Sequence, residues 1–279
     1  MKTIAYLSLV TLCLLIHSCG FAQATTNINM LAPDRIKSYQ KGGITYQSIA
    51  DFFEQLPQYS VKYHYVDFAQ GWKLIAKGED YCHFFAVYWP TDKNVVRSKK
   101  LTLRMRSPKI LINKSTLTNN DFKPPYNSKE ILRTKNLVGA MIRDHRFEYQ
   151  LHQWLSTQIA EESDHFIASD FSVDQMYMMF GKNRVDYLIT SPDTTLIMAP
   201  KPRKKIEYIP LTQDQKPYYH MQIVCTSNDK NRRFVEVADA NMALLYNNPN
   251  WRQLWSFIHF HQKDWGKKAL EDFIKQNQR

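Results

Sequence analysis

The sequence predicts an α/β protein with two lobes and a cleft between them. Along most of the chain, short strand-like apolar segments alternate with segments whose apolar residues follow helical i, i+3, i+4 spacing. Such alternation favours parallel, doubly wound sheets. It occurs as two series separated by extended stretches, which indicates two lobes. The 279 residues are 44% hydrophobic, which is enough for real cores.

The first series contains strands and helices with recognisable ends. Ser48 is the expected N-cap of its first helix, and Gly78 is the expected end of its second. Pro90 ends the last strand, because proline has no backbone N–H to donate to a sheet. In chain order we expect a strand at 28–31, a helix at 48–56, a strand at 61–66, a helix at 72–76 and a strand at 82–89.

The second series repeats the alternation, and helices close the chain. The stretch 113–128 is polar, contains prolines and is expected to be a loop or linker. Ser172 is the expected cap of a helix that ends at Gly181. The expected strands are 109–112, 137–142, 165–169, 185–189 and 220–226, and the expected helices are 146–159, 173–181, 235–246, 251–259 and 267–275.

The first 24 residues have the three parts of a secretory signal peptide. Lys2 supplies a positive start, residues 7–16 form an apolar run, and Ala22-Gln23-Ala24 offers a small-x-small cleavage site. The run is shorter than the about 20 residues that span a bilayer, so we favour export over a membrane anchor. An alternative is a lipoprotein lipidated at Cys19. Because His17 is unusual in a lipoprotein motif, we favour cleavage after Ala24 and a periplasmic protein.

The net charge of +11 does not point to nucleic acid. Export argues against that partner, and the basic residues form short clusters at 97–100, 201–205 and 230–233 among acidic residues, which is typical of solvated loops. The mature chain would keep two cysteines, Cys82 and Cys225, an even pair for an oxidising compartment. Their wide spacing is unlike that of zinc ligands.

The chain lacks the sequence signatures of several enzyme classes. It contains no Gly-x-Ser-x-Gly nucleophile motif, no P-loop and no His-Glu-x-x-His zinc motif. His259 and His261 lie two residues apart at a helix end, and we interpret them as solvated or capping side chains rather than metal ligands. We therefore expect no catalytic residues, no metal and no cofactor.

Four segments resemble the family 3 extracellular solute-binding proteins, the amino-acid-binding branch of type II periplasmic binding proteins. LIAKGEDYC at 74–82 is similar to the family's helix, glycine turn and strand, and WPTDKN at 89–94 stands where the family has Thr-x-x-Arg. NLVGAMIR at 136–143 and MMFGKNRVDY at 178–187 resemble two segments of the family's second lobe. The resemblance runs over roughly 28–276.

This resemblance implies a two-lobed fold in which two extended crossings, near 106–113 and 209–222, join the lobes. Lobe 1 would comprise 25–110 and 220–279, and lobe 2 would comprise 111–219. The strands that carry Cys82 and Cys225 are neighbours in the family's fold, which implies a disulfide with Cα atoms about 5.5–6 Å apart. The family's role implies a monomer that passes a small-molecule ligand to an ABC transporter permease or a membrane-bound sensor.

Departures from the family pattern bear on the ligand. The arginine that grips the ligand carboxylate in the family falls at Asn94, which is uncharged. The family's carboxylate for the ligand amine falls near Ser191 and Asp193. Arg143 and Asp144 precede the expected helix at 146–159, and two interpretations of them stay open. Either Arg143 binds an anion beside the free amides of that helix, or Asp144 caps the helix itself.

The ligand-binding candidates also include an aromatic side chain at the expected edge of the cleft. Trp89 ends a strand there, and both ligand stacking and core packing remain open for it. We expect a small polar or anionic, amino-acid-like ligand. An alternative is a degenerate family member that binds a protein or envelope partner and no solute. The complete set of candidates is Trp89, Thr91, Asn94, Arg143, Asp144, Ser191 and Asp193.

Overall fold

The structure is a computed structural model, and its description covers nine stretches of the chain. The predicted signal peptide with Cys19 lies outside these stretches, as do Arg143, Asp144 and Ser172. No helix in the described stretches is long and apolar enough to cross a bilayer. The described residues are 25–33, 43–66, 68–142, 146–161, 165–169, 173–193, 205–212, 215–259 and 265–278.

The first sheet has six strands in the described part of the chain, with the order β2-β1-β3-β11-β4, and β5 also pairs with β11. β1 pairs with β2 and β3 in parallel, whereas β11 runs antiparallel to β3, β4 and β5. The sheet is therefore mixed rather than wholly parallel as the sequence predicts. Its strands are β1 (Thr26–Pro33), β2 (Tyr59–Val66), β3 (Cys82–Ala86), β4 (Val95–Arg97), β5 (Leu103–Arg106) and β11 (Tyr218–Thr226).

The second sheet has five strands in the described residues, in the order β10-β6-β9-β7-β8. β7 is parallel to β8 and β9, and β6 is antiparallel to β9 and β10, so this sheet is mixed as well. Its strands are β6 (Lys109–Asn113), β7 (Gly139–Ile142), β8 (Phe166–Ser169), β9 (Tyr187–Thr190) and β10 (Ile206–Pro210).

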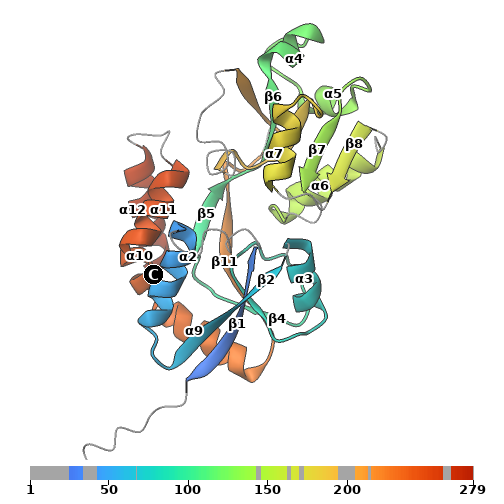
Figure 1. The fold of residues 1–279 in the computed structure, drawn as a ribbon. Helices are drawn as coiled ribbons and strands as arrows, with labels where there is room; N and C mark the ends of the chain where they lie inside the picture. Colours follow the sequence, from blue (N-terminus) through green and yellow to red (C-terminus); the bar gives the residue numbers. More distant parts are fainter. Residues whose placement is uncertain are drawn as a thin grey trace, which may run out of the picture.

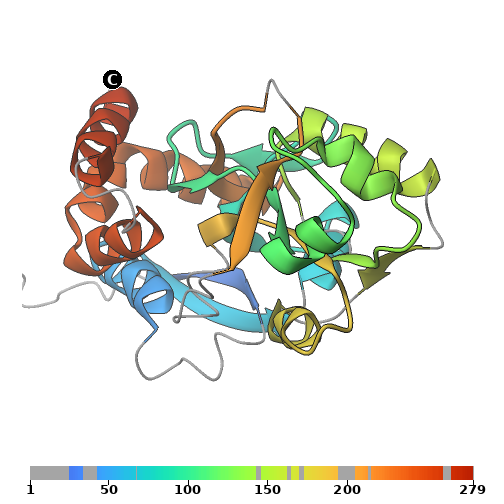
Figure 2. The same cartoon turned by 90° about the horizontal axis from the view of Figure 1, so that it is seen from above.

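Helices cover both faces of each sheet, as in doubly wound folds. In the first sheet, α2, α9, α10, α11 and α12 supply one core, and α3 supplies a second core on the opposite face. Both views place α11 beside α2 (Figures 1 and 2). These helices are α2 (Ile44–Glu54), α3 (Phe68–Ala76), α9 (Asp229–Ala240), α10 (Met242–Asn247), α11 (Pro249–His259) and α12 (Trp265–Gln278).

The second sheet is sandwiched in the same way. Along β6, Ile110 and Ile112 belong to the core under α4, α5 and α6, whereas Leu111 between them faces the core under α7. This alternation follows from the two-residue period of a strand. The helices are α4 (Lys114–Asn119), α5 (Ser128–Arg133), α6 (Tyr149–Glu161) and α7 (Val173–Gly181). We call the first sheet with its helices lobe 1 and the second sheet with its helices lobe 2.

The chain passes between the lobes at 107–108, after β5, and again between the end of β10 and the start of β11. Both crossings fall within the ranges that the sequence predicts. The two crossings also contact each other, because Ser107 N–H donates to the carbonyl of Pro217 (3.0 Å) and the Gln215 amide donates to the carbonyl of Pro108 (2.5 Å). β5 and β11 rise from lobe 1 toward these crossings (Figure 1). The exact division of the chain into lobes stays a prediction.

Several predicted elements have different bounds in the structure. α2 begins at Ile44 with Gly43 as its N-cap, so the prediction that Ser48 opens this helix is wrong. β3 ends at Ala86 rather than at 89. The predicted loop at 113–128 contains α4 and the start of α5.

Cys82 and Cys225 form the disulfide that the resemblance implies. They face each other directly across the antiparallel pair of β3 and β11, and both are fully buried. Their Cα atoms lie 3.9 Å apart, closer than the about 5.5–6 Å expected. The bond ties the parallel half of the sheet to its antiparallel half.

Candidate binding site between the lobes

The segment that follows β3 is a tight turn fixed by its own carboxylate. Asp92 N–H donates to the carbonyl of Trp89 (3.0 Å), and Trp89 N–H donates to Oδ2 of Asp92 (2.8 Å). Pro90 takes the second position of the turn, where its fixed φ is favourable. The turn therefore presents Trp89 and Asp92 as a rigid pair at the edge of lobe 1.

Arg146, which precedes α6 in lobe 2, contacts this edge of lobe 1. Its Nη1 atom donates to Oδ1 and Oδ2 of Asp92 at 2.8 and 2.7 Å. Its guanidinium carbon lies 3.4 Å from the ring centre of Trp72 and 4.4 Å from that of Trp89. The Arg146 and Asp92 side chains are only 12% and 11% exposed. We call Trp72, Trp89 and Asp92 the arginine cage.

Trp89 makes further contacts with lobe 2. Its indole Nε1 donates to the carbonyl of Phe147 (2.8 Å), and its ring lies 4.4 Å from that of His152 and 5.8 Å from that of Tyr149. Trp89 thus belongs to a contact between the lobes, and it also packs against the core of lobe 1, which is one of the two roles left open for it. Ligand stacking by Trp89 stays a prediction.

His83 of β3 lies beneath the arginine cage. Its ring is nearly parallel to that of Trp72, with 6.2 Å between the ring centres. Burial and, to a lesser extent, the positive charge of Arg146 lower the pKa of His83 to about 4. The imidazole is consequently neutral at physiological pH.

Ser191 and Asp193 lie at the crossings and are fully buried. Asp193 accepts from the backbone N–H of Arg106 (2.6 Å) and from its Nε atom (2.5 Å), while Ser191 Oγ donates to the carbonyl of Arg106 (2.9 Å). Burial raises the pKa of Asp193, and the adjacent guanidinium of Arg106 opposes that effect. In this structure the Asp193 carboxylate is engaged by the protein itself.

The remaining described candidates lie on the exposed side of lobe 1. Thr91 is exposed and lines a hollow of about 250 Å³ with Trp72, Lys93 and Arg146. Asn94 is exposed, and its backbone has a φ of 56°, in the left-handed region that asparagine tolerates better than most residues. Its carbonyl accepts from Ser227 N–H (2.7 Å). This backbone requirement is a reason for asparagine at position 94 that is independent of any ligand.

The structure therefore separates the predicted residues into groups. Trp89 and Thr91 lie at the arginine cage, Ser191 and Asp193 lie at the crossings, and Asn94 lies on the outer part of the β3–β4 segment. The sequence analysis did not select three residues of the interlobe contact: Trp72, Asp92 and Arg146. A signal for Asp92 was present, because an aspartate at the end of a Trp-Pro-x-Asp turn is placed to accept backbone hydrogen bonds.

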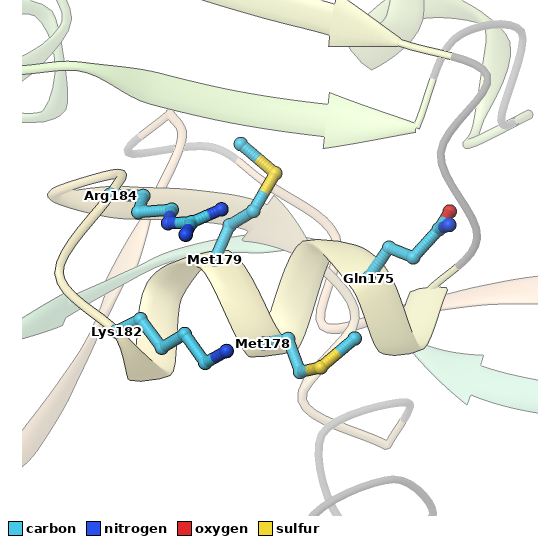
Figure 3. Close-up of a pocket in the computed structure, with 5 residues that line it drawn as sticks. All are labelled: Gln175, Met178, Met179, Lys182 and Arg184. Atoms are coloured by element: carbon cyan, nitrogen blue, oxygen red, sulfur yellow. The ribbon is translucent and has the colours of Figure 1, made fainter.

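A second hollow of about 300 Å³ lies on α7, where the sequence analysis places no candidate. Figure 3 shows Met179 and Arg184 on one side of the helix and Met178 and Lys182 on another. Met178 is 54% exposed. Because these side chains do not converge on one point, this hollow lacks the focused polar groups of a typical small-molecule site.

The interlobe contact has the chemistry of a site for cations. Two indole faces attract a positive charge through their π systems, and the carboxylate of Asp92 supplies a full negative charge beside them. A planar guanidinium fits between stacked rings and can donate more than one hydrogen bond to a carboxylate. Within the described residues, the chain's own Arg146 provides this group.

Solved structures share this fold. One, from work on glutathione import through GshT and the cystine importer TcyBC of Streptococcus mutans, is 11% identical, has a TM-score of 0.58 and covers 84% of this chain and 95% of that one. An ancestral arginine-binding protein bound to arginine is 13% identical, with a TM-score of 0.57 and coverage of 84% and 97%. A histidine kinase sensor domain similar to periplasmic binding proteins is 11% identical, with a TM-score of 0.55 and coverage of 79% and 93%.

These similarities define the class of fold, which is that of the type II periplasmic binding proteins, as the sequence resemblance implies. At such low identities the structures show the shared fold alone. No protein-family model matches the sequence, and no curated protein matches it.

Proposed function

We propose that this chain is an exported solute-binding protein, without catalytic activity, that captures a small polar or anionic, amino-acid-like ligand between its lobes. The ligand would pass to a transporter permease or to a membrane sensor. The proposal is supported by a fold shared with amino-acid-binding proteins of importers and with a sensor domain. The observation that carries it is the hollow of about 250 Å³ beside the arginine cage, which residues of both lobes line.

The ligand's anionic end is assigned to Arg143 and to backbone amides near the start of α6. Asn94 carries no charge, and Arg106 already engages the carboxylate of Asp193. We therefore do not expect the family's usual grip on an α-amino acid, with an arginine on the carboxylate and an aspartate on the amine. Thr91 and Trp89 remain proposed contacts on lobe 1, as a hydrogen-bond donor and an apolar face.

The first experiment is mass spectrometry of small molecules released by denaturing the purified mature protein. A thermal-shift screen of amino acids, small peptides and organic acids follows it. A ligand that binds only the folded state raises the melting temperature as its concentration exceeds Kd. Release of one compound that also raises the melting temperature would support the proposal. A protein that releases nothing and is shifted by no compound would contradict it.

Once a ligand is known, Arg143→Ala tests the proposed anion contact. We expect the affinity to fall by more than about threefold, which corresponds to about 0.7 kcal/mol. Isothermal titration calorimetry measures the change. The matched control is Arg184→Ala in the exposed segment between α7 and β9, which should leave the affinity unaltered. A smaller change for Arg143→Ala than threefold would make Arg143 an ordinary surface residue.

One observation favours a second candidate function, binding of a protein or envelope partner without any solute. Arg146 and Trp89 connect the lobes directly, so side chains occupy part of the space in which a solute would lie. The ligand-release experiment distinguishes the two functions, because a partner-binding protein would give no released compound and no thermal shift. The assignment of the lobes to 25–110 with 220–279 and to 111–219 is common to both functions.

A further inference from the structure

We propose that Trp72, Trp89 and Asp92 form a guanidinium-binding site on lobe 1 and that Arg146 of lobe 2 is its built-in occupant. The occupied site holds the lobes together without any solute, and a free alkylguanidinium ion competes with Arg146 for it. This inference does not depend on the proposed function, because it concerns contacts that are complete within the chain. It extends to a ligand class, planar cations, that the family resemblance does not assign to these residues.

The geometry of the site is specific for a flat cation. The guanidinium carbon of Arg146 lies 3.4 Å from the centre of the Trp72 ring and 4.4 Å from that of the Trp89 ring. At the same time, Nη1 donates to both oxygens of Asp92. An ammonium group has no flat face to place against an indole ring, so we expect the site to prefer guanidinium ions.

The ion pair is shielded from water and is therefore insensitive to moderate salt. The two charged side chains are 12% and 11% exposed, and Trp72 is only 6% exposed. Charged pairs at such depth are screened much less than exposed pairs. Asp92 also accepts from Trp89 N–H, so its carboxylate is held in place before any cation arrives. The site on lobe 1 is thus preformed.

The site and its occupant come from opposite lobes. The three residues of the arginine cage lie on α3 and in the turn after β3, whereas Arg146 lies in the segment between β7 and α6. Its neighbour Phe147 is fully buried in the core of lobe 2 and accepts from Trp89 Nε1, which fixes the base of the arginine. If the lobes separate, Arg146 must leave the cage, and the cage must lose its cation.

Free space adjoins the occupied cage. The hollow of about 250 Å³ is lined by Trp72, Thr91, Asp92 and Arg146, so a small cation can approach the indole and the carboxylate from solution. In the wild type the small cation must displace Arg146. Its apparent affinity is therefore the intrinsic affinity multiplied by the fraction of molecules in which the cage is vacant. Removal of the Arg146 side chain abolishes this competition.

The test compares Arg146→Ala with the wild type in two measurements. Small-angle X-ray scattering should show a larger radius of gyration for the variant, because the lobes are no longer held together. Titration with methylguanidinium, followed by tryptophan fluorescence, should show binding about tenfold tighter in the variant than in the wild type. Ethylammonium is the matched probe and should show no such gain.

Both results are required. A variant with an unchanged radius of gyration, or with no gain in affinity for methylguanidinium over ethylammonium, would overturn the proposal. Arg184→Ala removes an arginine elsewhere on lobe 2 and should change neither measurement. If Arg146→Ala does not fold, as judged by circular dichroism, Asp92→Asn decides the question. This isosteric variant keeps an oxygen for Trp89 N–H and removes the charge that pairs with Arg146. An Asp92→Asn protein with the radius of gyration of the wild type would contradict the inference.

Discussion

His83 is a buried imidazole next to the contact between the lobes. Its ring packs against Trp72, and Arg146 lies close enough to disfavour a positive charge on it. The site therefore contains one permanent cation and one imidazole that burial keeps neutral, with the charge of Arg146 as the lesser cause. Removal of Arg146 should raise the pKa of His83, since one of the two causes that lower it would be gone.

This arrangement predicts a loss of stability in mild acid. The pKa of His83 is about 4 in the folded protein, whereas an unfolded histidine has a pKa near 6.5. Between these values the unfolded state binds a proton that the folded state does not, so the free energy of unfolding falls as the pH decreases from about 6.5 to 4. The loss approaches about 3 kcal/mol at pH 4 and is absent above pH 6.5.

His83→Leu should remove this component. Urea unfolding of the wild type and the variant at several pH values measures it as the difference between the two pH profiles. Carboxylates such as Asp193 titrate in both proteins and cancel in that difference. Parallel profiles between pH 6.5 and 4 would show that His83 is protonated as easily in the folded protein as in the unfolded chain.

Single residues also show where sequence reasoning stops. The predicted end of a strand selects Trp89 and the family resemblance selects Thr91, and both lie where the lobes meet. Sequence reasoning could not find the partnership of Arg146 with Asp92, since the two are 54 positions apart and only the relative placement of the lobes brings them together. Nor could it foresee that Arg106 engages Asp193, a contact that spans 87 positions.

At the scale of elements, β7 and β9 meet at a glycine that a tyrosine ring covers. A Cβ atom on Gly139 would lie 2.2 Å from Cζ of Tyr187, and the other nearest atoms belong to the same ring. Gly139 pairs with Tyr187 across the two parallel strands, and the Tyr187 side chain is buried. The tyrosine ring thus covers the backbone of β7 where a side chain would otherwise stand.

Gly139→Ala should therefore destabilise the protein by about 1–3 kcal/mol, the usual cost of overpacking a core. Chemical denaturation measures the change. Gly71→Ala is the matched control, because its Cβ atom would meet Leu31 and Val66 at an ordinary 3.4 Å, and alanine favours the helix α3. A double variant with Tyr187→Leu should recover part of the loss. Equal stability of the two glycine variants would contradict this account.

Strong periodicity allowed most strands and helices to be located, and weak or local signals caused the misses. β4, β5 and β10 have three to five residues each, which is too short for a clear pattern. The expected helix at 235–246 is two helices, α9 and α10, which meet at Asn241. β11 is antiparallel in a sheet expected to be parallel. Its direction follows from the return of the chain from lobe 2 to lobe 1, which local sequence patterns do not encode.

At the scale of the whole molecule, the disulfide connects segments that the sequence keeps far apart. Cys82 and Cys225 are separated by 143 positions, and all of lobe 2 lies between them. A bond that closes so long a loop restricts the unfolded chain strongly, and its loss typically costs about 2–5 kcal/mol. It acts on lobe 1 directly, because β3 and β11 are neighbours at the centre of its sheet.

The double variant Cys82→Ala, Cys225→Ala should thus have a lower melting temperature than the wild type. Differential scanning calorimetry measures it, and the addition of a reductant to the wild type should give a similar decrease if the buried bond is reached. The reductant should have no effect on the double variant. A double variant as stable as the oxidised wild type would show that the packing of β3 on β11 is sufficient.

The central place of β11 also sets the order in which the protein can acquire its shape. Every strand of the second sheet lies between Lys109 and Pro210, so lobe 2 is complete in the growing chain before β11 exists. β3, by contrast, is synthesised early, and it pairs only with β1 until β11 at residues 218–226 has been synthesised. The first sheet, whose strands β1, β2 and β3 are made earliest, is consequently the last to be finished. Until then β1, β2 and β3 form an incomplete sheet with an open edge, where association with another chain is most favoured.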